Sequence, residues 1–205
     1  MTEESRYSAI ILAGGKSSRM GRRKADLDFG PATMFDLIAA EMLRAFDEMV
    51  VAVDEYRRYS WSDLPKVKLI KDDVPDRGPA FALEQALREI SFEAAFACSC
   101  DLPFVNGDLA RLLCTMLSEH DAVIPHVNGK LQPLHAVYRK SCAKILATMQ
   151  TAGLHSLHEI TEFANVRIVD EDEIRKHDPK LRSFFNVNTP ADYQRARKMI
   201  SDDSM

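Results

Sequence analysis

The sequence predicts an α/β fold built on a mostly parallel, mixed sheet. Short apolar runs alternate along the chain with stretches of helical periodicity, a pattern typical of strand–helix–strand units. The 205 residues are 46% apolar and 28% charged, which suits a soluble protein whose core needs neither disulfides nor a metal to be stable. No linker or repeat divides the chain, so we expect one domain over residues 1–205, with frayed ends at 1–6 and 201–205.

In the first half of the chain, the expected strands are short runs of Ile, Val, Leu and Ala, as in strands buried on both faces. They cover residues 8–13, 49–53, 67–70 and 94–99. Thr33 is a suitable N-cap, and the apolar residues after it recur at helical spacing to Phe46. A second helix is expected from Gly78 to Ile90, because Pro79 occupies the first helical position, where proline is tolerated.

The second half continues the same alternation. Further strands are expected at residues 122–125, 130–138, 166–169 and 184–187. Further helices are expected at residues 107–119, 140–151, 157–163 and 190–200. Asn128 and Gly129 form a suitable turn between two of the strands, and Pro190 begins the last helix in the position that proline favours.

Charge and cysteine content argue against several classes of protein. The 27 basic and 31 acidic residues give a net charge of −4, whereas a nucleic-acid-binding protein usually carries a basic excess. No run of about 18 apolar residues is present, so no membrane-spanning helix is expected, and the N-terminus lacks the basic segment of a secretory signal. The four cysteines are too scattered for a disulfide framework, so we expect reduced thiols and a cytoplasmic protein.

The segment that leaves the first strand, LAGGKSSRMGRRK, combines glycines with basic residues. Gly14 and Gly15 let backbone N–H groups approach a phosphate closely, and basic side chains that include Arg19 and Lys24 follow. Open parallel sheets bind ligands beyond the carboxyl ends of strands, so we expect a polyphosphate here. The spacing excludes a P-loop, whose first glycine would fall on Ile10, and it excludes the G-x-G-x-x-G dinucleotide fingerprint.

A carboxylate follows the fourth expected strand in the string CDLP. Asp101 would face the same crevice as the glycine segment if the two strands are neighbours, and Mg²⁺ prefers such hard oxygen ligands together with substrate phosphates. Asp72 also follows a strand, where it could contact a ribose or a second substrate, or belong to a charged loop. In the string FFNVNTP, Asn186 and Asn188 would share one side of a strand, and Asn188 could also cap the next helix.

Four strings together resemble the molybdenum cofactor guanylyltransferases of the MobA type. They are LAGGKSSRMGRRK, CDLP, QPLHAVYRK and FFNVNTPAD, which occur in the expected order between residues 12 and 192. The resemblance implies a Rossmann-like three-layer α/β/α nucleotidyltransferase fold. It also implies an enzyme that, with Mg²⁺ as its cofactor, transfers GMP from GTP to Mg/Mo-bound molybdopterin, giving molybdopterin guanine dinucleotide and pyrophosphate.

The resemblance also assigns roles to individual residues. The substrate-binding residues that it implies are Leu12, Ala13, Gly14, Gly15, Lys24, Asp72, Asp101, Asn186 and Asn188. Residues 12–14 would contact the guanine or the ribose, while Gly15 and the basic residues after it would hold the triphosphate. The implied catalytic residues are Arg19, Lys24 and Asp101, and the implied Mg²⁺ ligands are Asp101 and Asn188.

Alternatives remain open on the sequence alone. Asp54 follows the second strand where related guanylyltransferases often carry an asparagine near the base, which leaves room for a cytidylyltransferase or another sugar- or alditol-phosphate nucleotidyltransferase. A catalytically silent nucleotide-binding adaptor would keep the pocket but release no pyrophosphate. The expected partners are GTP and molybdopterin, followed by molybdoenzymes or other cofactor-biosynthesis proteins. We expect no nucleic-acid or membrane partner, and a monomer or weak oligomer.

Overall fold

Strands and helices alternate through the residues that the structure describes, which are 6–13, 24–53, 62–71 and 78–203 without the side chains of Lys24 and Asp203. The strands of this computed structural model are β1 (Ser8–Leu12), β2 (Glu48–Val53), β3 (Val67–Lys71), β4 (Ala94–Ser99), β5 (Ala122–Val127), β6 (Lys130–Leu131), β7 (His135–Arg139) and β8 (Val166–Val169). The α-helices are α1 (Met34–Ala45), α2 (Pro79–Glu89), α3 (Gly107–Thr115), α4 (Cys142–Thr151), α5 (Glu171–Arg175) and α6 (Pro190–Asp203). The short 3₁₀ helices are η1 (Lys24–Asp26), η2 (Leu157–Glu162) and η3 (Arg182–Phe184). None of the helices described is both long and apolar enough to cross a bilayer.

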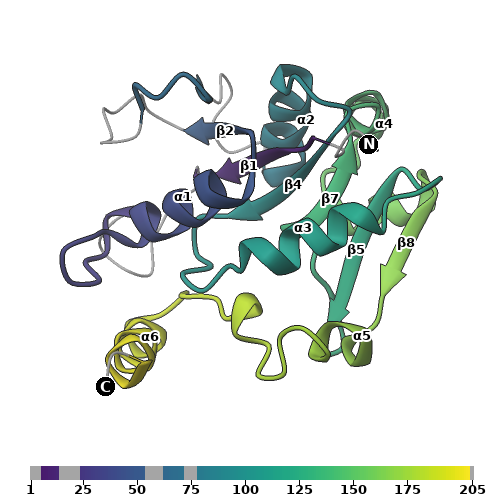
Figure 1. Cartoon of the computed structure of the whole chain (residues 1–205). Helices are drawn as coiled ribbons and strands as arrows, with labels where there is room; N and C mark the ends of the chain where they lie inside the picture. The colour runs from purple at the N-terminus through teal and green to yellow at the C-terminus, as the bar shows by residue number, and fades with distance from the viewer. Residues whose placement is uncertain (1–5, 14–23, 54–61, 72–77, 204–205) are drawn as a thin grey trace, which may run out of the picture.

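The strands form one mixed sheet in the order β3-β2-β1-β4-β7-β5-β6, with β8 beside β5 (Figure 1). Strands β3, β2, β1 and β4 run parallel to one another, and β8 is parallel to β5. In contrast, β7 is antiparallel to both β4 and β5, and β6 is antiparallel to β5. This arrangement confirms the mostly parallel mixed sheet expected from the sequence.

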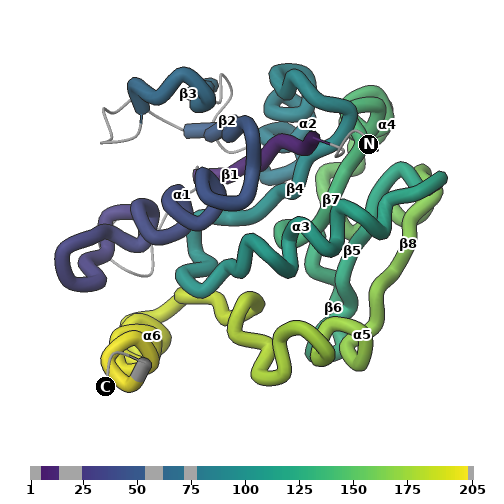
Figure 2. The backbone as a smooth tube through the Cα atoms, viewed as in Figure 1, coloured from purple at the N-terminus to yellow at the C-terminus, as the bar shows by residue number. Residues whose placement is uncertain are grey.

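Two apolar cores lie on opposite faces of the sheet, because successive strand residues alternate between faces. In β1, Ile11 belongs to the core covered by α1 and α3, whereas Ile10 belongs to the core covered by α2 and α4. The tube in Figure 2 shows these helices on the two sides of the strands, so the molecule has the three layers of an α/β/α fold. All four cysteines are free thiols, as expected.

Most elements begin and end close to the expected residues. The expected strands 94–99 and 166–169 coincide with β4 and β8. Thr33 caps α1 as expected, since its hydroxyl accepts from the Asp36 N–H and Asp36 Oδ2 accepts from the Thr33 N–H. α3 ends at Thr115, earlier than expected, and Ser118 follows with a φ of 38°.

Three expectations for the second half are wrong in their details. The strand expected at 130–138 is broken into β6 and β7, and Pro133, which has no N–H to donate, lies between them. The strand expected at 184–187 does not form, because η3 covers Arg182–Phe184 and the Val187 N–H donates to the Asp101 carbonyl instead of to a strand. The helix expected at 157–163 is the 3₁₀ helix η2, and α5 was not expected at all.

Candidate active site

The parallel half of the sheet has a topological switch point between β1 and β4. From β1 the chain passes through α1 to β2 on one side, whereas β4, which follows α2, lies on the other side of β1. The two connecting helices therefore cover opposite faces of the sheet. In open α/β sheets, ligands bind beyond the carboxyl ends of the strands at such a switch point. The candidate site is thus the edge formed by the ends of β1 and β4.

Asp101 lies at this edge, beside the point where the chain leaves β1. The strand register pairs Leu12 with Ser99, and the Cys100 N–H donates to the Leu12 carbonyl over 3.1 Å. The Asp101 side chain is half-buried, and its Oδ1 accepts a hydrogen bond from the Ser99 hydroxyl over 2.5 Å. The glycine-containing segment, which begins after Ala13, therefore starts next to the strand end that carries Asp101.

The segment 185–188 joins the same edge of the sheet. The Val187 N–H donates to the Asp101 carbonyl over 2.9 Å, so the neighbouring Asn186 and Asn188 flank a residue that is bonded to Asp101. The Asn186 Nδ2 donates to the Phe184 carbonyl over 3.1 Å, so part of this side chain stabilises its own turn. Because no strand forms here, the expectation that both asparagines share one side of a strand is wrong. The backbone of the Asp101 loop positions them instead.

Asn188 is held by the first turn of α6, and Thr189 rather than Asn188 caps that helix. The Thr189 hydroxyl accepts a hydrogen bond from the Asp192 N–H over 3.2 Å. In return, Asp192 Oδ2 accepts from the N–H groups of Asn188 and Thr189 at 3.2 and 2.9 Å. The hydrogen bond from Arg195 is the main cause that lowers the pKa of Asp192 to about 2, and the hydrogen bonds from Asn188 and Thr189 add to it. The ionised carboxylate therefore orders the backbone at Asn188.

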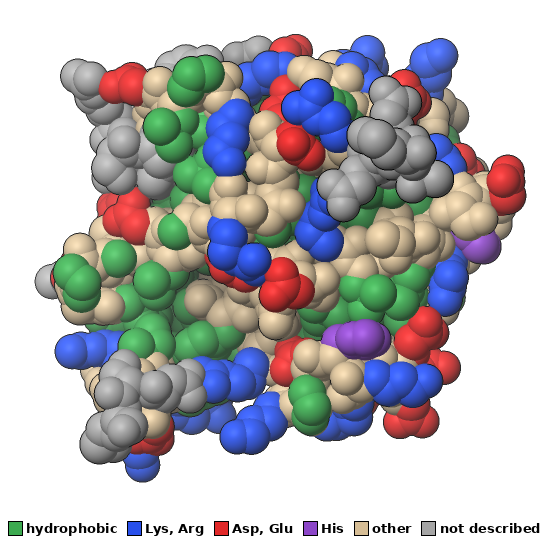
Figure 3. Space-filling view, in the orientation of Figure 1, with side chains coloured by type: hydrophobic (Ala, Val, Ile, Leu, Met, Phe, Trp, Pro, Cys, Tyr) green, Lys and Arg blue, Asp and Glu red, His purple; other side chains and the backbone are tan. Residues whose placement is uncertain are grey.

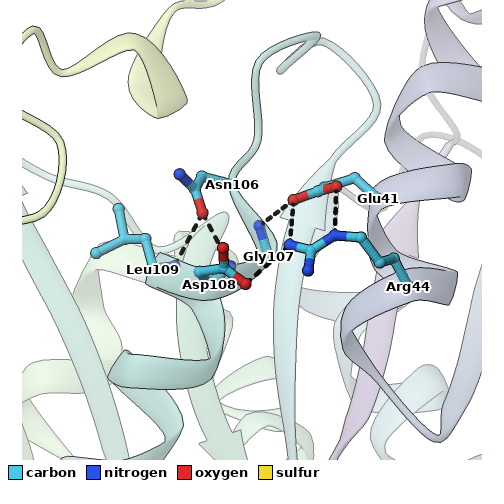
Figure 4. Close-up of polar contacts among 6 residues, drawn as sticks. All are labelled: Glu41, Arg44, Asn106, Gly107, Asp108 and Leu109. Atoms are coloured by element: carbon cyan, nitrogen blue, oxygen red, sulfur yellow. Dashed lines mark hydrogen bonds and ion pairs between the residues drawn. The ribbon is translucent and has the colours of Figure 1, made fainter.

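The loop that carries Asp101 is anchored at its far end by α1 (Figure 4). Gly107, the first residue of α3, donates its N–H to Glu41 Oε1 over 2.7 Å, and Arg44 donates to both Glu41 oxygens at 3.1 and 2.9 Å. Asn106 caps α3 through its side chain. The hydrogen bond from Arg44 lowers the pKa of Glu41, so the acceptor is ionised near neutral pH. No sequence signal indicated Glu41, because 66 positions separate it from Gly107.

The structure brings five of the sequence-predicted site residues to one edge, namely Leu12, Ala13, Asp101, Asn186 and Asn188. The predicted residue Lys24 begins η1, but its side chain is not among those described. The other predicted residues lie outside the described ranges, and they are Gly14, Gly15, Arg19 and Asp72. The roles assigned to all of these residues stay predictions.

The described edge supplies oxygen donors that suit a hard divalent cation. Asp101 offers a carboxylate and Asn188 a side-chain amide. Within the described ranges, no group of three or more His, Cys, Asp or Glu side chains could hold a metal by itself. Mg²⁺ fits such a sparse donor set, because it is usually bound through one or two carboxylates together with waters and substrate phosphates.

Solved structures of nucleotidyltransferases share this fold. The molybdopterin-guanine dinucleotide biosynthesis protein A of Archaeoglobus fulgidus matches with a TM-score of 0.81 and 25% identity, over 95% of this chain and 99% of that one. The 2-C-methyl-D-erythritol 4-phosphate cytidylyltransferase of Thermus thermophilus, 16% identical, matches with a TM-score of 0.68 over 94% of this chain and 98% of that one. The fold is that of the nucleotidyltransferase class.

Sequence comparison narrows this class to a family. The model of the MobA-like NTP transferase domain matches residues 9–168. A probable molybdenum cofactor guanylyltransferase of Methanosarcina mazei is 34% identical over 197 residues, which cover 91% of this chain and 88% of that protein. A probable molybdenum cofactor guanylyltransferase of Natranaerobius thermophilus is 32% identical over 201 residues, which cover 94% of this chain and 96% of that protein. The chain belongs to the MobA-like NTP transferase family.

Proposed function

We propose that this chain transfers GMP from GTP to molybdopterin, giving molybdopterin guanine dinucleotide and pyrophosphate. Relatives 30% and 34% identical are named probable molybdenum cofactor guanylyltransferases, and the A. fulgidus neighbour is named for the same dinucleotide. The observation that carries the proposal is the hydrogen bond from the Cys100 N–H to the Leu12 carbonyl, since it joins the strand ends that carry Asp101 and the glycine segment. A carboxylate can bind the metal ion of a metal–triphosphate, and the glycine segment beside it can bind the phosphates.

The nucleotide would bind across the carboxyl ends of β1 and β4. In this proposal, Leu12, Ala13 and Gly14 contact the guanine or the ribose. The triphosphate is bound by backbone N–H groups and cationic side chains of the residues that follow, chiefly Gly15, Arg19 and Lys24. The remaining nucleotide contacts come from Asp72 and Asn186.

Nucleotidyltransferases of this family generally use a divalent metal, and we infer that the metal here is Mg²⁺. Asp101 and Asn188 would hold it, as the oxygen donors at the edge allow. When bound, the metal neutralises charge on the triphosphate and polarises the α-phosphate. The hydrogen bond from Ser99 to Asp101 Oδ1 restricts the rotation of the carboxylate, which favours a fixed ligand position.

No side chain of the protein forms a covalent bond with the substrates in this reaction. A phosphate oxygen of molybdopterin attacks the α-phosphorus of GTP, and the bond from that phosphorus to the departing pyrophosphate oxygen breaks. Arg19 and Lys24 would offset the negative charge that builds up on the pyrophosphate. No general base is needed, because a phosphate monoester is largely ionised near neutral pH. The main contribution of the chain is to hold the two reacting groups in line.

Several features of the proposed enzyme follow from its family and chemistry. We infer that residues 1–205 act as one domain in the cytoplasm, as a monomer or weak oligomer, without a nucleic-acid or membrane partner. The dinucleotide product would pass to molybdoenzymes or to other cofactor-biosynthesis proteins.

The choice of nucleotide tests the proposal directly. The full chain is incubated with Mg²⁺, molybdopterin and GTP, CTP, ATP or UTP in separate reactions, and pyrophosphate and the pterin product are measured. GTP alone should give a dinucleotide with stoichiometric pyrophosphate. Reaction with CTP instead would identify a cytidylyltransferase, and nucleotide binding without pyrophosphate would identify a silent adaptor.

Two substitutions test the residue assignments in the same assay. Asp101→Asn should lower the turnover rate by at least about 10²-fold with little change in thermal stability, as expected when a metal ligand is replaced by a side chain of the same size. Lys24→Ala should lower it by about 10²-fold or more, because charge on the leaving group is no longer offset. Asp172→Asn, which changes an exposed carboxylate on α5, is the matched control and should retain full turnover. Wild-type turnover of the Asp101 variant would contradict the metal assignment.

A further inference from the structure

The C-terminal helix α6 is bonded to the segment that precedes α1. The Tyr193 hydroxyl donates to the Asp28 carbonyl over 2.5 Å. The Tyr193 ring also packs edge-on against Phe29, with ring centroids 5.3 Å apart and planes at 85°. One turn of helix further on, Ala196 is fully buried in the core that α1 covers. Figure 3 shows apolar side chains gathered on the surface between α1 and α6, consistent with this contact.

The segment bonded to Tyr193 follows the short 3₁₀ helix η1, whose first residue is Lys24. Residues 27–34 form a tight turn, in which the Met34 N–H donates to the Leu27 carbonyl over 2.8 Å and the Phe29 N–H donates to the Ala32 carbonyl over 2.9 Å. η1 connects this turn to Lys24 without any flexible linker, because Leu27 follows Asp26 at once. A displacement of the turn therefore displaces the backbone of Lys24.

The same helix also contacts the segment that carries Asn186 and, through it, the loop that carries Asp101. The Arg195 guanidinium lies over the Phe185 ring at 5.4 Å, and Phe185 directly precedes Asn186. Phe185 in turn packs against Phe104, with centroids 5.9 Å apart, and Phe104 belongs to the loop that carries Asp101. α6 is thus in contact with the segment that precedes α1 and with the segment that carries Asn186, and through the Phe185 ring with the loop that carries Asp101.

We propose that Tyr193 is a positioning residue for nucleotidyl transfer: it fixes the backbone next to Lys24 relative to the Asp101 and Asn188 side of the site. This inference rests on the proposed function. Apolar packing of the two rings buries the turn but is not directional. The hydrogen bond to the Asp28 carbonyl is directional, so it also fixes the position of the turn. Nucleotidyl transfer depends on alignment of charged groups around the phosphates, so a small displacement of the turn lowers the rate.

Three full-length variants test the role of Tyr193. Tyr193→Phe keeps the ring contact with Phe29 and removes only the hydrogen bond, whereas Tyr193→Ala removes both. Tyr7→Phe is the matched control, since Tyr7 precedes β1 at the opposite end of that strand and its ring contacts Arg111. For each variant, kcat and KM for GTP are measured by pyrophosphate release at a temperature well below Tm, and amide hydrogen exchange is measured over residues 27–34 without substrate.

The two Tyr193 variants should differ in degree. Loss of one hydrogen bond should lower kcat/KM for GTP by about two- to tenfold in Tyr193→Phe. Loss of the ring contact as well should lower it by about ten- to a hundredfold in Tyr193→Ala. In both Tyr193 variants, the amide hydrogens of residues 27–34 should exchange faster than in the wild type. Tyr7→Phe should match the wild type in kcat/KM for GTP and in amide exchange.

The possible failures can be told apart. Wild-type kinetics in both Tyr193 variants, with only a lower Tm, would show a purely structural contact and overturn the inference. Unchanged exchange over residues 27–34 in Tyr193→Ala would overturn it as well, whatever the activity. A wild-type protein that releases no pyrophosphate with any nucleotide would instead overturn the proposed function, together with the role that depends on it.

Discussion

At the scale of single residues, His135 is unusual because it is a fully buried imidazole among aromatic rings. Its ring centroid lies 5.0 Å from that of Phe96 and 4.2 Å from that of Phe184. Neither ring nitrogen has a hydrogen-bond partner among the described residues. Burial lowers the pKa of His135 to about 3, although the charge of Asp178 acts in the opposite direction. The imidazole is therefore neutral and behaves as an apolar side chain between Phe96 and Phe184.

His135→Phe should stabilise the protein, because it replaces two buried polar atoms without partners by apolar atoms of similar shape. We expect a gain of about 1 kcal/mol in unfolding free energy at pH 7. At pH 5 the gain should rise by about 2 kcal/mol, since the unfolded wild type binds a proton below its pKa of about 6.5 and the folded protein cannot. Urea unfolding at pH 7 and at pH 5 measures the difference in unfolding free energy between the variant and the wild type. His177→Gln, which removes an imidazole at an exposed position, is the control. A His135 variant less stable than the wild type at both pH values would contradict this account of His135.

At the scale of elements, the approach of α1 and α3 explains why a glycine begins α3. A Cβ on Gly107 would lie 2.6 Å from the Ala45 Cβ and 3.0 Å from Glu41 Oε1. Ala45 is part of α1 and its Cβ cannot rotate away, so the two helices would have to separate. The hydrogen bond from the Gly107 N–H to Glu41 depends on the same close approach. Helix packing therefore controls the far end of the Asp101 loop.

Gly107→Ala should destabilise the protein by about 1–3 kcal/mol, as expected for overpacking between rigid groups. It should also lower turnover, because the loop that ends at Gly107 carries Asp101. Thermal unfolding and pyrophosphate release measure the two effects. Ala45→Gly in the same chain removes the clashing Cβ and should restore part of both losses. If the single variant is as stable as the wild type, the close approach does not constrain this position.

Local sequence pattern predicted the elements whose residues determine their own structure. β4 and α1 follow from an apolar run and from a cap with helical periodicity, and both are local signals. The segment 184–187 looks like a strand by the same criteria, but its backbone bonds to Asp101, more than 80 positions away. In the candidate site, Asp101 could be predicted from its place after a strand. The contacts of Glu41 and Tyr193 could not, since they join helices to segments that are distant in the sequence.

At the scale of the whole molecule, a buried carboxylate ties the parallel strands together at the end opposite the site. Glu48 at the start of β2 accepts hydrogen bonds from the Ser8 hydroxyl at 2.6 Å and from the Ser91 hydroxyl at 2.7 Å. Its Oε1 also lies 2.7 Å from the Lys68 ammonium on β3. Burial acts to raise the pKa of Glu48, but these bonds outweigh it and lower the pKa to about 2. The ionised form therefore stabilises the folded sheet.

The contribution of Glu48 should be lost in acid. Its folded pKa lies below the unfolded value, so the stabilisation is complete above about pH 4.5 and disappears as the pH falls toward 2. At pH 7, Glu48→Gln should cost about 2 kcal/mol after allowance for the partly exposed Lys68. Urea unfolding should show this difference shrinking steadily between pH 5 and pH 3. A difference that stays constant over this range would mean that the charge of Glu48 does not stabilise the sheet.

We infer that the triphosphate and its metal bind at the carboxyl ends of β1 and β4. Crystals of the full chain grown with GTP and Mn²⁺, without molybdopterin, test it through the anomalous signal of the metal. We expect one anomalous peak at a ligand distance of about 2.1 Å from an Asp101 carboxylate oxygen, continuous with density for the phosphates above the end of β1. Metal and triphosphate bound at another edge of the sheet, with no peak at Asp101, would contradict the claim.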